Sequence, residues 1–321
     1  SFLLALYLLL DVFLRRGFLA TLISLPVLTG SKAGIGLVIL VGHLGKVLGI
    51  PDDKGPVLQT ILQILGNLDQ IHWPTLALAL VTIGILVFLP RLTRRLPAPL
   101  VAVAAGILAA VLLNLDSHGV KLVGEIPAGL PSLSLPDLSL VSALWPGALG
   151  IALMSFVESI ASARSFAKHD DPPVDADQEL LALGAANVGG GFFQAYPAGG
   201  GTSQTAVNDQ AGARSQLAEA VTAGFIAVTL IFLAPLIGLM PQATLGALVL
   251  VAAAGLIKVG EFRAIGRFRS HELAWAIITF AGVVVLGTLE GILVAVVASM
   301  LDIIVQANHP PVYVMGRKPG T

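Results

Sequence analysis

Long apolar stretches, separated by short polar ones, make up most of the chain. Apolar segments fall at 2–14, 18–42, 74–90, 97–114, 143–166, 179–192, 203–211, 214–238, 243–257, 272–288 and 291–306. Most of them approach the roughly 20 residues that an α-helix needs to cross a lipid bilayer. The pattern predicts an all-α integral membrane protein, with about eleven segments in these 321 residues.

A glycine-rich stretch between the two shortest segments predicts a broken helix. Three glycines at 189–191 are followed by an aromatic piece with Pro197 and by three more glycines at 199–201, and the helix restarts at Thr202 and Ser203, which are good N-cap residues. Lipid cannot satisfy free backbone N–H and C=O groups, so such backbone lines a protected or watery cavity. A helix N-terminus that faces a cavity favours anions. The break therefore predicts an anion carrier.

Composition narrows the possible functions. The chain is 56% hydrophobic and 12% charged, against about 25% charged residues in soluble domains. A net charge of −1 argues against nucleic acid as a partner. There is no cysteine, the six histidines show no metal-ligand spacing, and no phosphate-binding glycine motif is present. We therefore expect neither an enzyme nor a metal or cofactor site.

Positive charge predicts the orientation. If segment ends alternate between the two sides, one side receives fourteen Lys and Arg residues and the other only Lys46, Lys54 and Lys121. The richer side is expected to be cytoplasmic. The alternation works only if 179–211 enters the membrane and returns as two elements. This reading makes 116–142 extracellular and the C-terminus cytoplasmic.

Glu158 is the acid most suggestive of function, because it lies well inside an apolar segment. An ionisable residue there is costly and should face the interior of the bundle. It is either a proton-coupling acid or a structural acid paired with a base. Ser155, Ser159 and Ser162 lie near the same helix face and either line a watery path or serve helix packing.

The restarting half-helix supplies the candidate substrate site. Thr202, Ser203, Gln204 and Thr205 offer amides and hydroxyls, and an aromatic wall is expected from Phe192, Phe193 and Tyr196. The alternative is aromatic packing around a kink. Lys32 also falls mid-segment, and three explanations are open for it: an acid partner, an anion ligand, or a locally non-native sequence.

Three motifs resemble the SulP family of sulfate permease-type anion transporters, which includes pendrin and prestin. They are Leu25-Pro-Val-Leu-Thr-Gly, Ser155-Phe-Val-Glu-Ser-Ile-Ala and the specific stretch at 205–218. The resemblance implies a 7+7 inverted-repeat fold of 14 segments, with core and gate domains and a homodimeric assembly. It implies a substrate site between the half-helix near Thr202 and an opposing half-helix. Proline starts at Pro26 and Pro241 also suggest an inverted repeat.

The chain departs from the family pattern in several places. We expect a transmembrane domain at 1–308 that lacks the first three family segments, and at 309–321 the start of a linker to an absent cytoplasmic STAS domain. Gln204 stands where many relatives have arginine, and Ser31-Lys32 stands where relatives often have phenylalanine. The missing arginine favours proton-coupled symport over simple exchange.

The sequence thus predicts a secondary active transporter of small anions in the inner (cytoplasmic) membrane of a bacterium. Sulfate, bicarbonate and C4-dicarboxylates such as fumarate are the expected substrates, moved with protons by alternating access. The expected partners are the anion, the proton, the lipid bilayer and a second copy of the chain. An uncoupled anion channel or an anion exchanger of the same fold is the alternative.

Overall fold

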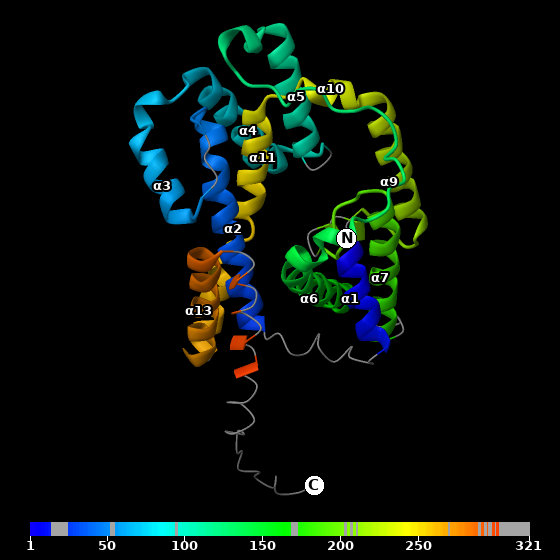
Figure 1. Ribbon diagram of the computed structural model, residues 1–321. Helices are drawn as coiled ribbons and strands as arrows, with labels where there is room; N and C mark the ends of the chain where they lie inside the picture. Colours follow the sequence, from blue (N-terminus) through cyan, green and yellow to red (C-terminus); the bar gives the residue numbers. More distant parts are fainter. Residues whose placement is uncertain are drawn as a thin grey trace, which may run out of the picture.

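The computed structural model describes most of the chain, and its described part is helical. It covers residues 1–13, 25–51, 55–93, 96–167, 173–201, 204–205, 208–209, 211–268, 270–287, 290–291, 294, 297–298 and 300–301. The only β-pairing among these residues is a single antiparallel bridge between Leu122 and Pro241. The helices form two bodies that lie side by side (Figure 1).

The first body, called here the α2 body, is built around the long helix α2. It comprises α2 (Leu25–Leu48), α3 (Val57–Gly66), α4 (Trp73–Leu92), α5 (Ala98–Leu112), α11 (Gln242–Ala254), α12 (Val259–Phe268) and α13 (Ser270–Leu286). Helix α2 packs along both α11 and α13, and α4 packs against α11 and α5. Chain segments from both halves of the sequence are therefore interleaved in this body.

The second body, called here the α6 body, groups α1, α6 and α7. Helix α1 (Phe2–Phe13) packs against α6 (Val141–Phe166) and α7 (Ala176–Phe192). The shared core is formed by Leu4, Leu8, Ala152, Phe156, Ile160 and Leu180. Helix α9 (Leu217–Val228) begins beside this body and continues through a π-helical turn, η5 (Thr229–Leu233), into α10 (Ala234–Gly238), which leads to the α2 body (Figure 1).

The loop between α5 and α6 also connects the two bodies. The orientation predicted from the sequence puts this loop on the extracellular side. It includes the short 3₁₀ turns η3 (Leu115–His118) and η4 (Leu138–Leu140). Its backbone bonds both bodies, since Lys121 accepts from the Gln242 N–H of α11 and the Ser134 N–H donates to Phe192 of α7. At the end of this loop, a hydrogen bond from the Ser139 hydroxyl and a weaker effect from the Ser139 N–H lower the pKa of Asp137 from its usual value.

Small residues let α2 approach its neighbours closely. A side chain at Gly30 would run into the backbone of Ala276 on α13, and one at Gly34 would meet Val283 on the same helix. On another face of α2, Gly36 lies against Ala253 of α11. Close packing through small residues is typical of helices associating in membranes. The glycines of α2 thus position the helix that carries Lys32.

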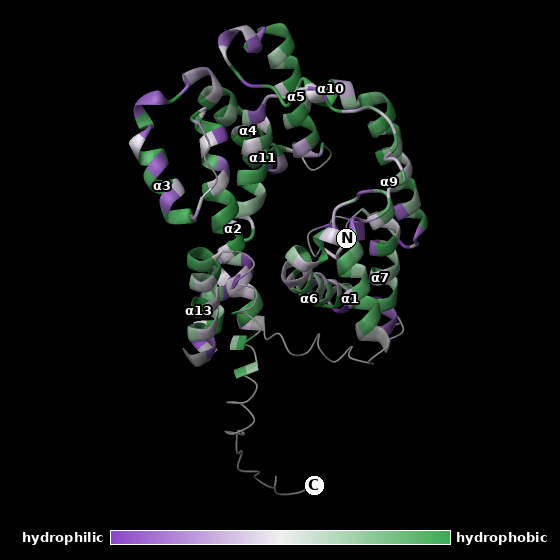
Figure 2. Ribbon diagram, in the orientation of Figure 1, coloured by the Kyte–Doolittle hydropathy of each residue, from purple (hydrophilic) through white to green (hydrophobic). Residues whose placement is uncertain are grey.

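The length and surface of the helices suit a membrane. Five described segments are long and apolar enough to span one: Pro26–Leu48, Trp73–Leu92, Leu138–Phe166, Leu217–Gly238 and Gln242–Arg267. Large apolar side chains are exposed on α4, α5 and α9, and Figure 2 shows that hydrophobic residues predominate along these helices. Such surface is expected where helices face lipid tails.

The predicted segments differ from the structure in three places. Helix α2 continues to Leu48 rather than ending at 42, and the His43 ring bonds the Ile39 carbonyl oxygen one turn back on the same helix at 2.9 Å. Helices α3 and α12 were not predicted. Both are short and amphipathic, with polar residues such as Gln59, Gln63 and Arg263 along one side, so a search for long apolar runs passes over them.

We predict that Gly30→Ala destabilises the protein by about 1–3 kcal/mol, because the new methyl group forces α2 away from α13. Gly42→Ala on the same helix is the matched control, since nothing lies within 4 Å of its Cβ position. It should stabilise the helix by about 1 kcal/mol. Thermal unfolding in detergent measures both variants. Equal unfolding temperatures for the two would contradict the close packing of α2 on α13.

Candidate functional site

The predicted helix break is present. Helix α7 ends at Phe192, and residues 193–201 are not helical. Helical backbone is present again at 204–205 and 208–209, and the Thr205 N–H and hydroxyl both donate to the carbonyl oxygen of Gly201, at 2.9 Å each. Thr202 and Ser203 lie outside the described residues. The described parts of the half-helix are therefore 204–205 and 208–209.

Asn187 holds the extended segment against α7. Its side chain is fully buried. Its Nδ2 donates to the carbonyl oxygens of Leu183 (2.9 Å) and Ala198 (3.0 Å), and its Oδ1 accepts from the Ala198 N–H at 2.9 Å. The amide thus supplies both backbone groups of Ala198 with partners. No role was predicted for Asn187 from the sequence, although an amide inside an apolar helix is a signal for such a contact.

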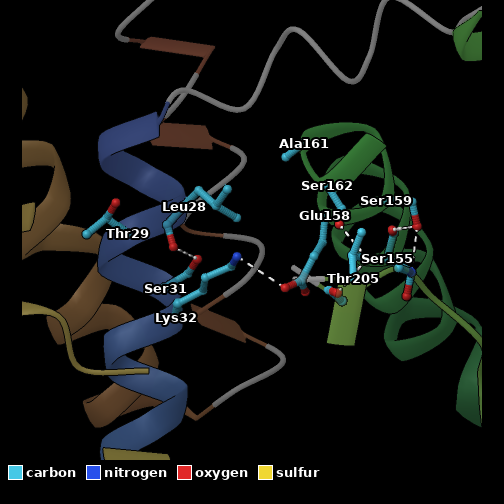
Figure 3. A network of polar contacts seen from close by, with 12 residues as sticks. Leu28, Thr29, Ser31, Lys32, Ser155, Glu158, Ser159, Ala161, Ser162 and Thr205 are labelled. Carbon is cyan, nitrogen blue, oxygen red and sulfur yellow. Dashed lines mark hydrogen bonds and ion pairs between the residues drawn. The ribbon is translucent and has the colours of Figure 1, made fainter. Parts of the chain in front are cut away.

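Helix α6 supports the other side of the glycine stretch (Figure 3). The Gly200 N–H donates to Ser159 Oγ at 2.7 Å, and that hydroxyl donates to the Ser155 carbonyl oxygen at 2.7 Å. A side chain at Gly200 would overlap Ser159, so only glycine allows this approach. One turn further, Ser162 Oγ donates to Thr205 Oγ1 at 3.0 Å. The serine face predicted on α6 therefore bonds the extended segment and the restarting helix.

Glu158 lies on α6 among these serines and reaches out of its own body. Its Oε1 is 3.1 Å from Nζ of Lys32 on α2, and the Glu158 and Lys32 side chains are 29% and 26% exposed. Figure 3 shows the two side chains pointing toward each other, with Thr205 next to Glu158. Of the three explanations open for Lys32, the structure supports an acid partner.

The depth of the two charged residues is similar. At 1.5 Å per residue, Lys32 lies about 10 Å from the start of α2 and Glu158 about 12 Å from the end of α6. The charge pattern predicts that these two helix ends face the same side. Both charges then lie well inside the apolar layer, where an ion pair is less costly than either charge alone.

Gln204 and Thr205 line a cavity of about 730 Å³ beside the half-helix. The rest of its wall comes from Gly199, Gly200, Gly201, Asn208, Ala211, Glu219 and Thr222. Asn208 Nδ2 donates to Glu219 Oε1 at 2.6 Å, which brings α9 to the half-helix. Glu219 and Thr222 were not predicted, because only the fold brings α9 to this cavity. Among the described residues, the wall contains an acid but no basic side chain.

The aromatic residues lie apart from this cavity wall. Phe192 packs edge-on against Phe2 of α1, with ring centroids 6.0 Å apart. Phe193 is half exposed and Tyr196 is almost fully exposed. None of the three is among the residues lining the cavity. Their role at the substrate site stays a prediction. In the part of the chain that the structure describes, no three His, Asp or Glu side chains gather as metal ligands would.

A broken helix at membrane depth, held by side-chain hydrogen bonds, is the arrangement found in secondary transporters. The chain belongs to the sulfate permease family, whose model matches residues 1–279. It is an integral membrane protein, and the relatives it matches are named as transporters rather than enzymes.

Two relatives illustrate the similarity. A probable sulfate transporter of Mycobacterium tuberculosis is 37% identical over 308 residues, which cover 95% of this chain and 55% of that protein. The chloroplastic sulfate transporter 4.1 of Arabidopsis thaliana is 30% identical over 318 residues, covering 96% and 46% of the two chains. The chain therefore spans about half the length of the curated relatives it matches.

Solved structures share the fold. A structure of SLC26A9 superposes with a TM-score of 0.87 at 26% identity, covering 95% of this chain and 50% of that one. The transmembrane domain of the cyanobacterial bicarbonate transporter BicA gives a TM-score of 0.75 at 25% identity, covering 93% and 74%. These likenesses confirm the predicted helical membrane fold of the inverted-repeat kind.

We predict that Asn187→Ala destabilises the protein, because it removes the two hydrogen bonds that the buried Asn187 side chain forms with the backbone of Ala198, at about 0.5–1.5 kcal/mol for each bond. Asn67→Ala is the control, since the Asn67 side chain bonds only groups close to it in sequence, the Gln63 carbonyl oxygen and the Gln70 side-chain amide. Thermal unfolding of both variants in detergent measures the difference. A loss no larger for Asn187→Ala than for Asn67→Ala would show that the amide does not hold the segment.

We also predict that Gly200→Ala impairs transport, because its methyl group overlaps Ser159 and displaces the glycine stretch from α6. Gly189→Ala is the matched control in the first glycine triplet, with nothing within 4 Å of its Cβ position. Anion uptake by proteoliposomes should fall about tenfold or more for Gly200→Ala and stay near wild type for Gly189→Ala. Similar uptake by both would place the substrate site away from this contact.

Proposed function

We propose that this chain forms part of a secondary active transporter that moves a small anion together with a proton by alternating access. The observation that carries the proposal is the position of Glu158. It is an acid at membrane depth, on a helix whose neighbouring serines bond the glycine stretch and the first turn of the half-helix. An acid in such a position is a functional site by default.

The anion site in this proposal lies at the restart of the half-helix. Free amides at a helix N-terminus and the helix dipole favour a negative charge. Thr202, Ser203, Gln204 and Thr205 would contribute amides and polar side chains. The cavity beside Gln204 and Thr205 has room for an anion of the expected size. In the proposal Phe192, Phe193 and Tyr196 bound the approach to this site.

Glu158 carries the proton in this proposal. As a carboxylate it balances the charge of Lys32, and on protonation it becomes neutral and leaves that lysine without its partner. The protonation state of Glu158 thus changes the charge beside the anion site by one unit. Protonation makes the surroundings of the anion site more positive, so proton binding favours anion binding.

The relatives indicate which anions to test. The Mycobacterium and Arabidopsis proteins are named as sulfate transporters, and the structural neighbour BicA as a bicarbonate transporter. We propose sulfate, bicarbonate or a C4-dicarboxylate such as fumarate as the substrate. In the alternating-access cycle the α6 body would act as the moving core domain and the α2 body as the gate domain.

The proposal includes an assembly and an orientation. A homodimer in the inner cell membrane, with a cytoplasmic C-terminus, follows from the family and from the side richer in arginine and lysine. Residues 1–308 would form the transporter domain, and 309–321 would begin the linker to a cytoplasmic STAS domain. Residues 309–321 lie outside the described part of the chain.

One observation favours the alternative of an uncoupled channel or exchanger. Lys32 already balances the charge of Glu158 at 3.1 Å, so the acid has an adequate structural role if it never takes up a proton. In that case anion flux would not depend on a proton gradient.

We predict saturable uptake of at least one of these anions by proteoliposomes, increased several-fold by an inward proton gradient. Glu158→Gln should remove the dependence on the gradient, because a glutamine cannot take up a proton. Glu125→Gln, an acid in the exposed loop, is the control and should behave as wild type. No saturable uptake of any anion would overturn the carrier proposal, and a wild-type pH profile for Glu158→Gln would overturn proton coupling at this residue.

A further inference from the structure

Lys32 and Glu158 belong to different bodies, and their contact joins the two. Lys32 is fixed on α2, which is packed into the α2 body through Gly30, Gly34 and Gly36. Glu158 is fixed on α6, whose serines bond the glycine stretch of the α6 body. The other ion pair formed between two described residues, Lys258 with Glu261, stays within one turn at the start of α12. The Lys32–Glu158 contact is therefore positioned to respond to movement between the bodies.

We propose that Lys32 is a coupling residue of the transport cycle, because its ion pair with ionised Glu158 ties the α6 body to the α2 body in the conformation seen here. The inference rests on the proposed function. Leaving this conformation with Glu158 ionised separates the pair and leaves two unpaired charges at membrane depth, which is costly. Protonation of Glu158 removes the tie, so the α6 body leaves this conformation with its proton bound.

The same contact favours the return step. After the proton and the anion have left on the other side, Glu158 is again a carboxylate without a partner. Returning the α6 body to the conformation seen here restores the pair with Lys32. The ion pair thus makes the step out of this conformation depend on protonation of Glu158. It also favours the return of the empty carrier to this conformation. A lysine on the other body is required for both effects, whereas a base on the α6 body would move together with Glu158.

Other titratable groups of described residues do not take part in the contact between Lys32 and Glu158. Among the described residues, the helices packed against α2 and α6 carry other titratable groups, but none of them has a hydrogen bond or ion pair with either residue. Those on α2 and α6 themselves are His43, Lys46 and Arg164, and those on packed helices are Tyr7, Arg91, Asp177, Glu179, Glu261, Arg263, Arg267 and Glu272. Of these, Glu261 bonds a different residue of α2, since it accepts from Thr29 at 3.3 Å, and it is paired with Lys258.

The test uses the full-length protein that contains this chain, in proteoliposomes, with uptake measured from pH 5.5 to 8. Lys32→Gln should keep anion uptake but reduce its dependence on the proton gradient from several-fold to less than about twofold, because departure no longer requires the proton. Lys32→Arg keeps the charge and should retain the wild-type pH profile. Lys46→Gln removes a lysine from the last turn of the same helix and is the matched control.

The double variant Lys32→Gln/Glu158→Gln distinguishes an effect on proton coupling from a loss of folding stability. It leaves no lone charge at membrane depth, so it should fold even if Lys32→Gln is unstable. If the two residues act through one contact, adding Lys32→Gln to Glu158→Gln should not change the pH profile further. An additional shift in the double variant would mean that Lys32 acts independently of Glu158 and would overturn the inference.

A second measurement follows the bodies directly. The 321 residues contain no cysteine, so within them spin labels attach only to engineered cysteines at Leu80 of α4 and Leu181 of α7, two exposed side chains on different bodies; any cysteine elsewhere in the full-length protein is replaced by serine. At pH 8 the wild type should show one dominant distance between the labels, and at pH 5.5 a second distance should gain population. Lys32→Gln should show the second distance already at pH 8.

Two results would overturn the inference while leaving the proposed function standing. One is a Lys32→Gln protein that transports with the wild-type pH profile and label distances. The other is a Lys32→Arg protein that behaves like Lys32→Gln, since the tie depends on charge. Absence of uptake by the wild type, or a wild-type pH profile for Glu158→Gln, counts instead against the proposed function.

Discussion

The structure of the site depends on one constraint, which is that backbone polar groups away from water must be hydrogen-bonded within the protein. A helix broken at membrane depth leaves several of these groups without helical partners. Asn187 supplies both groups of Ala198, and Ser159 supplies the N–H of Gly200. These side chains come from α7 and α6, so the break is stable only while both helices lie against it.

This requirement also determines where the charged groups lie. Because Ser159 and Ser162 bond the glycine stretch and Thr205, α6 is held in a fixed rotation beside the half-helix. Glu158 is adjacent to Ser159 and is therefore directed toward α2 rather than toward the core of its own body. The acid that we propose as the proton carrier is thus positioned by the same contacts that stabilise the break.

Hydropathy, charge and glycine pattern were enough to predict the helical membrane fold, the break and the candidate acid, because each depends on residues close together in the chain. They did not reveal α3 and α12, whose amphipathic sequences resemble connecting loops. Nor did they reveal the partner of Lys32 or the place of Glu219 in the cavity wall, since those contacts join distant segments. The aromatic residues were grouped by their nearness in sequence, and the structure spreads them between a contact with α1 and exposed positions.

The partial exposure of the ion pair bears on how it can work. A fully exposed pair contributes little, because water and salt screen it. A fully buried pair is difficult to break and offers a proton no path to the carboxylate. With side-chain exposures of 26% and 29%, Lys32 and Glu158 lie between these limits. In the proposed cycle, their attraction favours the arrangement of the two bodies seen here, and the partly exposed carboxylate takes up the proton. An ion pair of this kind suits a contact that must form and break once in each cycle.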